Sequence, residues 1–212
     1  MYIIQVIGVH STMINTASNH NSSERLNQKV CNIKVEKLIR EANDSFVYYR
    51  DYESAIELIN EALNIDPNHI KGLILKGNIL FCLDKDTEAL EYFDKAIRVN
   101  PLSAEAYGSK AGTLDILGRQ IEALTFCEKA FEHITVKDQH LLPALFDQKL
   151  AILVRMKKYE KAREELKKCT KILPEEDGSY LVSCYQNAIE TFCKEKKRKR
   201  ERVAKISLQI VS

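Results

Sequence analysis

A spacing of roughly 34 residues recurs along this chain and constrains its fold more than any other feature. Pro67 and Pro101 are one such interval apart, and each follows an amphipathic stretch. Twelve residues before each proline stands an alanine, and the same small residue recurs at the corresponding place in four copies: Ala55, Ala89, Ala123 and Ala162. Self-similarity with such a period predicts stacked copies of one supersecondary unit.

The spacing within each copy predicts a pair of helices. With the alanine at repeat position 20, the units cover 36–69, 70–103, 104–137 and 143–176. Positions 4, 8 and 11 lie on one stripe of a first helix, and positions 20, 24 and 27 on one stripe of a second. Small residues also occupy position 27: Ala62, Ala96, Ala130 and Cys169. Small residues let two antiparallel helices approach closely, while larger ones fill the remaining space.

The residues at the first-helix positions follow the same logic. Position 4 holds Ile39, Leu73, Tyr107 and Phe146; position 8 holds Asn43, Gly77, Ala111 and Leu150; position 11 holds Phe46, Leu80, Leu114 and Leu153. Position 24 of the second helix holds Ile59, Phe93, Cys127 and Leu166. The proline at position 32 ends the second helix and turns the chain toward the next unit.

These letters resemble a known family. An aromatic residue or Leu, then Gly or Ala, then A-x3-F-x2-A and Pro within one period is similar to the tetratricopeptide repeat, and KGLILKGNILFCLDKDTEALEYFDKAIRVNP is the best match. The resemblance covers about 36–176. It implies an all-α fold, a right-handed α-solenoid of about four helix pairs, followed here by a C-terminal capping helix.

Two departures from the pattern affect the expected packing. Thr135 stands where the third unit should have its proline, and five extra residues, 138–142, precede the fourth unit. We therefore expect an irregular junction there, for which a lengthened helix is one form. Asn43 occupies a place that is small in the next two units, so the first unit should have the least regular inner packing.

The ends of the chain carry separate expectations. Residues 1–31 are expected to be poorly ordered, and Met13 is an alternative start, which would place residues 1–12 outside the translated protein. At the other end, apolar residues at 3–4 spacing from Ser179 predict a capping helix over 177–202 with a basic end, and 203–212 form an apolar tail. Because no apolar run is long enough to cross a bilayer, the expected location is cytoplasmic.

Motifs for catalysis or cofactor binding are not found in the sequence. It contains no Gly-rich phosphate loop, no G-x-S-x-G, no H-E-x-x-H and no CxxC pair, so we predict neither enzymatic activity, nor a cofactor, nor a metal site. His133 and His140 are interpreted as solvated loop residues. The six cysteines are far apart, which is typical of small apolar side chains in a reducing compartment.

The resemblance implies that the chain binds another protein, as an adaptor or scaffold. In this family the first helices line a concave groove that takes an extended peptide or a helix. Groove-facing places are repeat positions 2, 5, 9, 12 and 13. The predicted partner-binding residues at these places are Lys37, Arg40, Tyr48, Lys71, Ile74, Asn78, Phe81, Asp115 and Arg155. The later units place small residues there: Gly108, Gly112, Ala144 and Ala151.

One binding mode of the family is disfavoured by the residues. Members that bind chaperones hold a partner's C-terminal carboxylate with Lys, Asn and Arg at fixed positions, because a carboxylate needs several converging donors. The corresponding places starting from the first unit hold Arg40, Asp44, Leu75, Glu105 and Ser109, and the set starting from the second unit fails as well. A role as a heat-shock co-chaperone is therefore not expected.

Two basic features allow alternatives. Position 7 is a lysine in three units, Lys76, Lys110 and Lys149, which form either a basic ladder or apolar stems with heads in water. The segment 194–205 carries eight Lys or Arg and two Glu, against a chain total of +2. It is interpreted as the solvated end of the capping helix, as a contact for nucleic acid or an acidic protein, or as a nuclear import signal. A nucleic-acid-associated protein and a regulatory subunit of an enzyme are thus the alternatives to an adaptor.

Overall fold

The computed structural model describes residues 25–211 of the chain, with side chains described up to residue 199. The chain divides into two compact units, residues 1–79 and 80–212, and each is described by itself. The predicted all-α class is confirmed, since the described residues form helices and turns and contain no strand. Of the segment 1–31 that was predicted to be poorly ordered, residues 1–24 lie outside the described residues, whereas residues 25–31 are helical.

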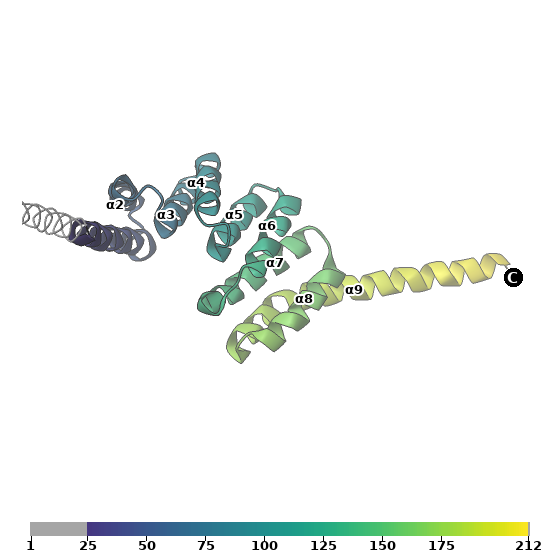
Figure 1. Ribbon diagram of the computed structural model, residues 1–212. Coiled ribbons are helices and arrows are strands. Elements are labelled where there is room, and N and C mark those ends of the chain that lie inside the picture. The colour runs from purple at the N-terminus through teal and green to yellow at the C-terminus, as the bar shows by residue number, and fades with distance from the viewer. Residues whose placement is uncertain (1–24, 212) are drawn as a thin grey trace, which may run out of the picture. The chain divides into compact units, whose positions relative to one another are not determined.

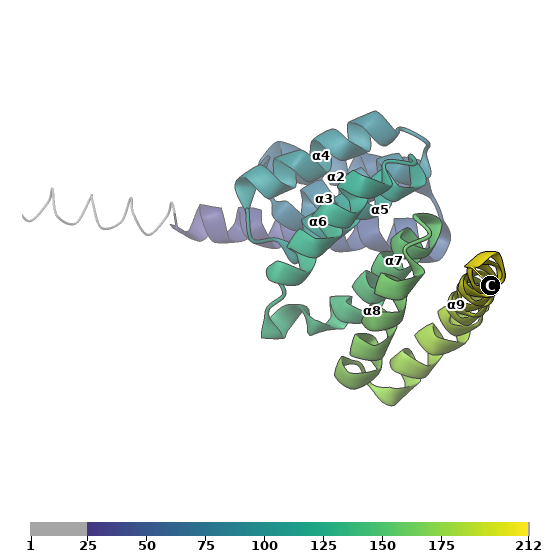
Figure 2. The same cartoon turned by 90° about the vertical axis from the view of Figure 1, so that its right-hand side faces the viewer.

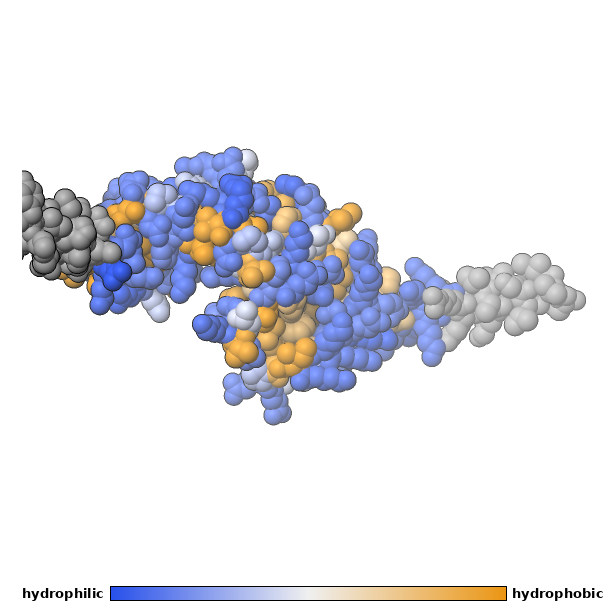
Figure 3. All heavy atoms as spheres, viewed as in Figure 1, coloured by the Kyte–Doolittle hydropathy of each residue, from blue (hydrophilic) through white to orange (hydrophobic). Residues whose placement is uncertain are grey.

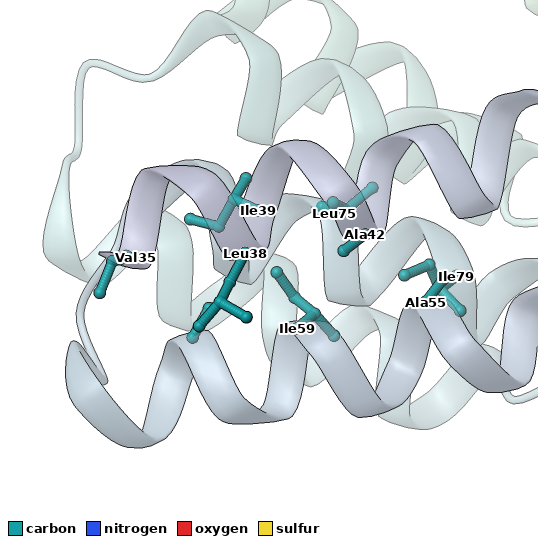
Figure 4. Close-up of a cluster of buried hydrophobic side chains, with 9 residues drawn as sticks. Val35, Leu38, Ile39, Ala42, Ala55, Ile59, Leu75 and Ile79 are labelled. Carbon is teal, nitrogen blue, oxygen red and sulfur yellow. The ribbon is translucent and has the colours of Figure 1, made fainter. Parts of the chain in front are cut away.

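The first unit is built around three helical segments. A helix over 25–44 continues into a π-helical turn, η1 (Ser45–Tyr49), and is followed by α2 (Tyr52–Ile65) and the first part of α3 (Ile70–Cys82). Its core is formed by apolar side chains from all three segments, among them Leu38, Ala42, Ile59 and Ile79 (Figure 4). Burial of these side chains is the main stabilising contribution available to so short a unit.

The π-turn corrects the predicted register of the first helix. Ala42 is fully buried, whereas Asn43, which was predicted at the small position, is exposed. The separation from Ala42 to Ala55 is one residue longer than the corresponding separation from Gly77 to Ala89 in the next copy. The π-turn takes up the extra residue, because a π-helix contains more residues per turn than an α-helix. Residues before it therefore stand one place away from their predicted positions.

The second unit contains consecutive helices joined by short turns (Figures 1 and 2). They are α4 (Asp86–Val99), α5 (Ala104–Ile116), α6 (Gln120–Glu132), α7 (Leu142–Arg155), α8 (Tyr159–Ile172) and α9 (Glu175–Val211). Each of them packs against the next along the chain from α4 to α9. In the view of Figure 3, apolar side chains reach the surface around the place that Figure 1 labels α8, and hydrophilic residues border them.

The predicted second-helix stripe is confirmed in every copy. All residues at positions 20, 24 and 27 are buried: Ala55, Ile59 and Ala62; Ala89, Phe93 and Ala96; Ala123, Cys127 and Ala130; Ala162, Leu166 and Cys169. Most of the first-helix positions are buried as well, including Leu73, Leu80, Leu114, Leu150 and Leu153. The alternation of small and large residues therefore sets the helix packing, as the period suggested.

The turns between paired helices share one backbone conformation. Four residues have positive φ at corresponding places: Arg50, Asp84, Gly118 and Lys157, with φ of 53°, 58°, 76° and 57°. A backbone hydrogen bond closes each of these turns, as from Lys158 N to Leu153 O at 2.8 Å and from Asp51 N to Ser45 O at 3.0 Å. The left-handed conformation ends an α-helix by reversing the chain, and only glycine adopts it without steric cost.

The junction between α6 and α7 is irregular, as predicted. It is not a lengthened helix, however, but a separate 3₁₀ turn, η2 (Val136–Leu141). Thr135 replaces the expected proline and caps this turn, since its hydroxyl and its N–H both bond the Asp138 carboxylate. The turn thereby accommodates the additional residues before α7.

The C-terminal helix is longer than expected. α9 begins at Glu175 and runs without interruption to Val211, so a helix occupies both the predicted capping segment and the predicted apolar tail as far as 211. Three acidic residues, Glu175, Glu176 and Asp177, stand in its first turn, where they interact favourably with the helix dipole. In the described part of the chain, no helix combines the length and apolar character that crossing a bilayer requires.

The six cysteines differ in burial, and Cys193 is half-buried. Cys127 and Cys169 are buried among apolar side chains, as predicted for all six. Cys31, Cys82 and Cys184 are exposed, which corrects that interpretation. Burial raises the pKa of the Cys127 thiol to about 12.

Candidate functional site

A groove lies between α5 and α7 in the second unit, and these are the first helices of two consecutive pairs. Its volume is about 290 Å³. We call it the α5–α7 groove, and its lining residues are Ala104, Glu105, Gly108, Ser109, Leu141, Ala144, Leu145 and Gln148. Small and polar side chains dominate this list, so a partner's backbone could approach the helices closely.

Two glycines of α5 allow α7 to pack so near. A Cβ atom on Gly108 would lie 3.0 Å from Leu145 Cδ2, and one on Gly112 would lie 2.7 Å from Gln148 Nε2. Contacts below about 3.0 Å are not found for real Cβ atoms, so Gly112 in particular has no room for a side chain unless Gln148 moves. The glycines thus set the width of the groove.

Gln148 links the two walls of the groove. Its Nε2 donates a hydrogen bond of 3.1 Å to the carbonyl of Gly108. Its Oε1 is buried and has no hydrogen-bond partner among the described residues. A buried acceptor without a partner is uncommon in folded proteins and calls for an explanation.

An ion pair joins the same two helices further along. Arg155 Nη1 of α7 donates to Asp115 Oδ2 of α5. The Asp115 side chain is 5% exposed and that of Arg155 is 47% exposed. The second carboxylate oxygen, Asp115 Oδ1, is buried and has no partner in the described part of the chain. The pair therefore neutralises a largely buried carboxylate and leaves one further acceptor unsatisfied.

α9 follows α8 in the place that the first helix of a further pair would take, and Tyr185 connects it to α7. Its hydroxyl donates to Asp147 Oδ1 at 2.8 Å, and the Asp147 carbonyl lies 3.2 Å away. Burial, together with this hydrogen bond, raises the pKa of the Tyr185 phenol above its ordinary value of 10. Polar contacts thus connect α5 to α7 and α7 to α9.

The predicted groove residues are divided between the units, six in the first and three in the second. Asp115 and Arg155 are in contact, which the sequence did not indicate, and Phe81 is partly buried. In the first unit Tyr48 is 75% exposed in the π-turn and Lys71 is exposed, whereas Asn78 is half-buried.

Three of the predicted residues need correction. Ile74 is 1% exposed, so its side chain belongs to the core and is not available to a partner. Lys37 and Arg40 precede the π-turn, so the register shift moves them one place beyond positions 2 and 5. Lys37 forms an exposed ion pair with Glu41 at 3.5 Å, and Ile39 takes the place that Arg40 was expected to fill.

The sequence interpretation missed the role of Gln148 as a link between walls. It also missed the contact of Tyr185 with Asp147. The separation between Gly108 and Gln148, which is the same as that between Asp115 and Arg155, is the signal that could have indicated facing pairs. It exceeds the repeat period because of the inserted residues before α7.

Two lysines at position 7 do not form an exposed basic ladder. The Lys110 side chain is 13% exposed, pairs with Asp94 at 2.5 Å and stands 4.1 Å above the Phe126 ring. Lys149 is 14% exposed and pairs with Glu165 at 3.3 Å. Their ammonium groups are therefore held between helices rather than in water. This arrangement differs from both alternatives that the sequence suggested. Lys76 also has an interaction partner.

Metal chemistry has no candidate site among the described residues, where no cluster of three or more His, Cys, Asp or Glu side chains could hold an ion. His133 is half-buried and stacks on the Tyr107 ring at 5.3 Å, so it is not a solvated loop residue as predicted. His140 is exposed, and its Nδ1 lies 3.2 Å from Lys137 O.

Comparisons with known proteins agree with this architecture. A family model described as the tetratricopeptide repeat matches residues 50–69, 70–101 and 146–175. None of the curated proteins matches the chain by sequence.

Several solved structures are similar in fold. PilF of Pseudomonas aeruginosa has a TM-score of 0.60 at 17% identity, over 76% of this chain and 74% of that one. MamA of Desulfovibrio magneticus has a TM-score of 0.54 at 19% identity, over 65% of this chain and 75% of that one. The TPR2B domain of yeast Sti1, in complex with pHsp70, has a TM-score of 0.53 at 20% identity, over 58% of this chain and 98% of that one.

Proposed function

We propose that this chain, which carries tetratricopeptide repeats and has the fold of proteins built from them, is a non-catalytic protein-interaction module that holds an extended peptide segment in the α5–α7 groove. The observation that carries the proposal is the groove itself, with its small-residue lining and two unsatisfied acceptors on the helices that border it. An adaptor or scaffold in the cytoplasm is the biological role that fits this chemistry.

The unsatisfied acceptors favour a ligand that donates hydrogen bonds. Gln148 Oε1 and Asp115 Oδ1 both belong to the first-helix side of the second unit. A peptide backbone offers N–H donors at regular intervals, and Gln148 lines the groove, so its Oε1 is the acceptor such a donor would reach first. Satisfying a buried acceptor removes a desolvation penalty of about 1–3 kcal/mol, which would contribute to binding.

The charges of the groove argue against a carboxylate clamp. Glu105 stands in the groove wall, and Arg155 is already engaged with Asp115. The Sti1 domain of related fold is in complex with pHsp70, but the residues here lack the converging lysine and asparagine donors of a chaperone-binding member. We propose a partner segment that is neutral or mixed in charge, with small side chains where it crosses α5.

A variant that fills the groove tests the proposal. Ala144 is exposed on α7 and lines the groove, so Ala144→Arg would occupy the space without entering the core. Ile121→Arg is the matched control, because Ile121 is 74% exposed on α6 and lies outside the groove. Affinity capture from the native host, quantified by mass spectrometry, should lose a specific set of partners with Ala144→Arg only. Equal capture by both variants and the wild type would count against the groove.

A further inference from the structure

A second groove, separate from the α5–α7 groove, lies between α8 and α9. Its volume is about 580 Å³, and Leu166, Val182, Ile189 and Cys193 contribute apolar surface to it. Leu166 and Ile189 are buried, whereas Val182 and Cys193 are half-buried. An apolar depression of this size is where a helix of a partner could insert its side chains.

The repeat geometry shows what the groove would accommodate. Lys167 and Thr170 of α8 stand at the repeat positions that Asp94 and Phe131 occupy in earlier helix pairs. In those units Asp94 pairs with Lys110 of the next first helix, and the Phe131 ring lies 4.9 Å from the Phe146 ring of the next first helix and 5.2 Å from Lys149 Nζ. This face of a second helix therefore receives the first helix of the following pair.

Only one helix of such a pair is present among the described residues. α9 packs on α8 as α7 packs on α6, but it continues as a single helix to Val211. In the preceding pair, α8 covers α7. No described helix covers α9 in this way, and the α8–α9 groove is the surface that remains. The groove therefore offers apolar surface beside a first helix that has no second helix of its own among the described residues.

The border of the groove is strongly basic. Arg163 and Lys167 of α8 and Lys194 and Lys197 of α9 line it, and one acidic residue, Glu190, stands among them. Glu190 is already engaged, since it accepts a hydrogen bond from Gln186 at 2.7 Å and lies 3.5 Å from Lys194. No acidic partner for Lys167 is found among the described residues. The groove thus combines an apolar floor with an excess of positive charge.

We propose that the α8–α9 groove docks an amphipathic helix of a partner protein whose apolar face is flanked by acidic residues. Apolar side chains at helical spacing would fill the floor, and Asp or Glu on either side would pair with the basic border. A second copy of this chain is a poorer occupant, because pairing two such grooves would bring two basic borders together. The helix would complete the last pair in the stack.

The test uses the full chain and a fluorescently labelled synthetic helix of about 20 residues, with Leu at i, i+3, i+4 and i+7 and Glu on the flanks, measured by fluorescence anisotropy. Two further peptides serve as comparisons, one with the flanking Glu replaced by Lys and one of the same composition in scrambled order. We expect the acidic helix to bind at least about tenfold more tightly than the basic helix, with affinity that falls as salt is raised. Equal binding of the acidic and basic peptides, or no saturable binding below about 1 mM, would overturn the proposal.

Variants locate the binding on the chain. Lys167→Glu reverses a charge of the border, whereas Lys161→Glu makes the same change on α8 outside the groove and is the control. Lys167→Glu should weaken the acidic peptide roughly threefold to tenfold and Lys161→Glu by less than about twofold. Equal effects of the two variants would contradict the assignment, and thermal melts establish that both are folded.

Two additional outcomes are decisive. A dimer in sedimentation equilibrium that Lys167→Glu dissociates would identify a second copy as the occupant and overturn the proposal. Ala144→Arg in the α5–α7 groove should leave binding of the acidic helix unchanged. Because that variant separates the two surfaces, failure of this proposal leaves the peptide-binding proposal intact, and the reverse also holds.

Discussion

Arg155 of α7 forms an ion pair with Asp115 of α5, a residue that precedes it by 40 positions and whose side chain is almost completely buried. The contact joins the first helices of two consecutive pairs beside the α5–α7 groove. Its consequences for stability can be measured directly, because the arginine is half-exposed and can be removed without opening the core.

Arg155→Met should destabilise the protein by about 1–3 kcal/mol, because it leaves the buried Asp115 carboxylate without a partner on either oxygen. Urea denaturation gives this free energy of unfolding. Arg119→Met is the control, since Arg119 and Glu122 are both about half-exposed and a solvated pair of this kind contributes little to stability. In a double-mutant cycle, Arg155→Met should cost much less in the Asp115→Asn background than in the wild type. Equal costs in the two backgrounds would show that the two side chains are not coupled.

Lys157→Gly should stabilise the chain by about 0.5–1 kcal/mol, because Lys157 has a φ of 57° in the turn before α8, a conformation that glycine adopts without the steric cost borne by other residues. The gain is partly offset because glycine has more conformational freedom in the unfolded chain. Lys161→Gly, inside α8, should instead cost about 1 kcal/mol. If thermal melts show both variants destabilised equally, the left-handed turn is not present.

Ala89→Leu tests the packing of the helix pairs. Ala89 is fully buried at the small position of α4, so three additional carbon atoms should overpack the contact and cost about 1–3 kcal/mol. Denaturant midpoints compare it with Leu102→Ala, a change of similar size at a residue that is 66% exposed. An unfolding free energy unchanged by Ala89→Leu would contradict the register of the repeat.

Glu165 should make the second unit sensitive to acid. Burial would raise the pKa of its carboxyl, but Lys168 at 2.8 Å and Lys149 at 3.3 Å outweigh that effect and lower the pKa below the ordinary 4.5. A carboxyl with a lowered pKa in the folded state stabilises it fully above the ordinary value and loses this contribution as the pH falls through the folded-state value.

Glu165→Gln should therefore reduce the free energy of unfolding at about pH 7 and have a progressively smaller effect below about pH 4.5. Urea titrations at both ends of this range measure the difference. Glu164→Gln is the control on the exposed neighbouring residue. A Glu165→Gln effect that is independent of pH would show that the carboxylate charge is not what stabilises the structure.

The helix pairing was predictable because small and large residues alternate with the periods that two packed helices require. Ala89, Phe93 and Ala96 illustrate this, since burial of each follows from its repeat position. The first helix was placed one residue out of register, because the period alone cannot decide between the adjacent Ala42 and Asn43. The π-turn that absorbs the extra residue depends on tertiary packing, so no local pattern announced it.

The site was less predictable than the fold. Repeat positions indicated that Asp115 and Arg155 belong to first helices. Whether two such side chains pair depends on how successive helix pairs are offset along the chain, and the insertion before α7 alters that offset. Ile74 was assigned to the groove on its position, yet packing buries it. The roles of Gln148 and Tyr185 depend on contacts between helices that lie far apart in the sequence.

The most direct test of the peptide-binding proposal places a photoreactive benzoylphenylalanine at Ala144 in the groove and, separately, at Ile121 on the outer side of α6. After irradiation in the native host, mass spectrometry identifies the cross-linked peptide. If the α5–α7 groove binds a peptide, one partner segment should be cross-linked at 144 and be absent at 121. Cross-links to the same proteins from both positions, or partner cross-links at 121 alone, would contradict the proposal.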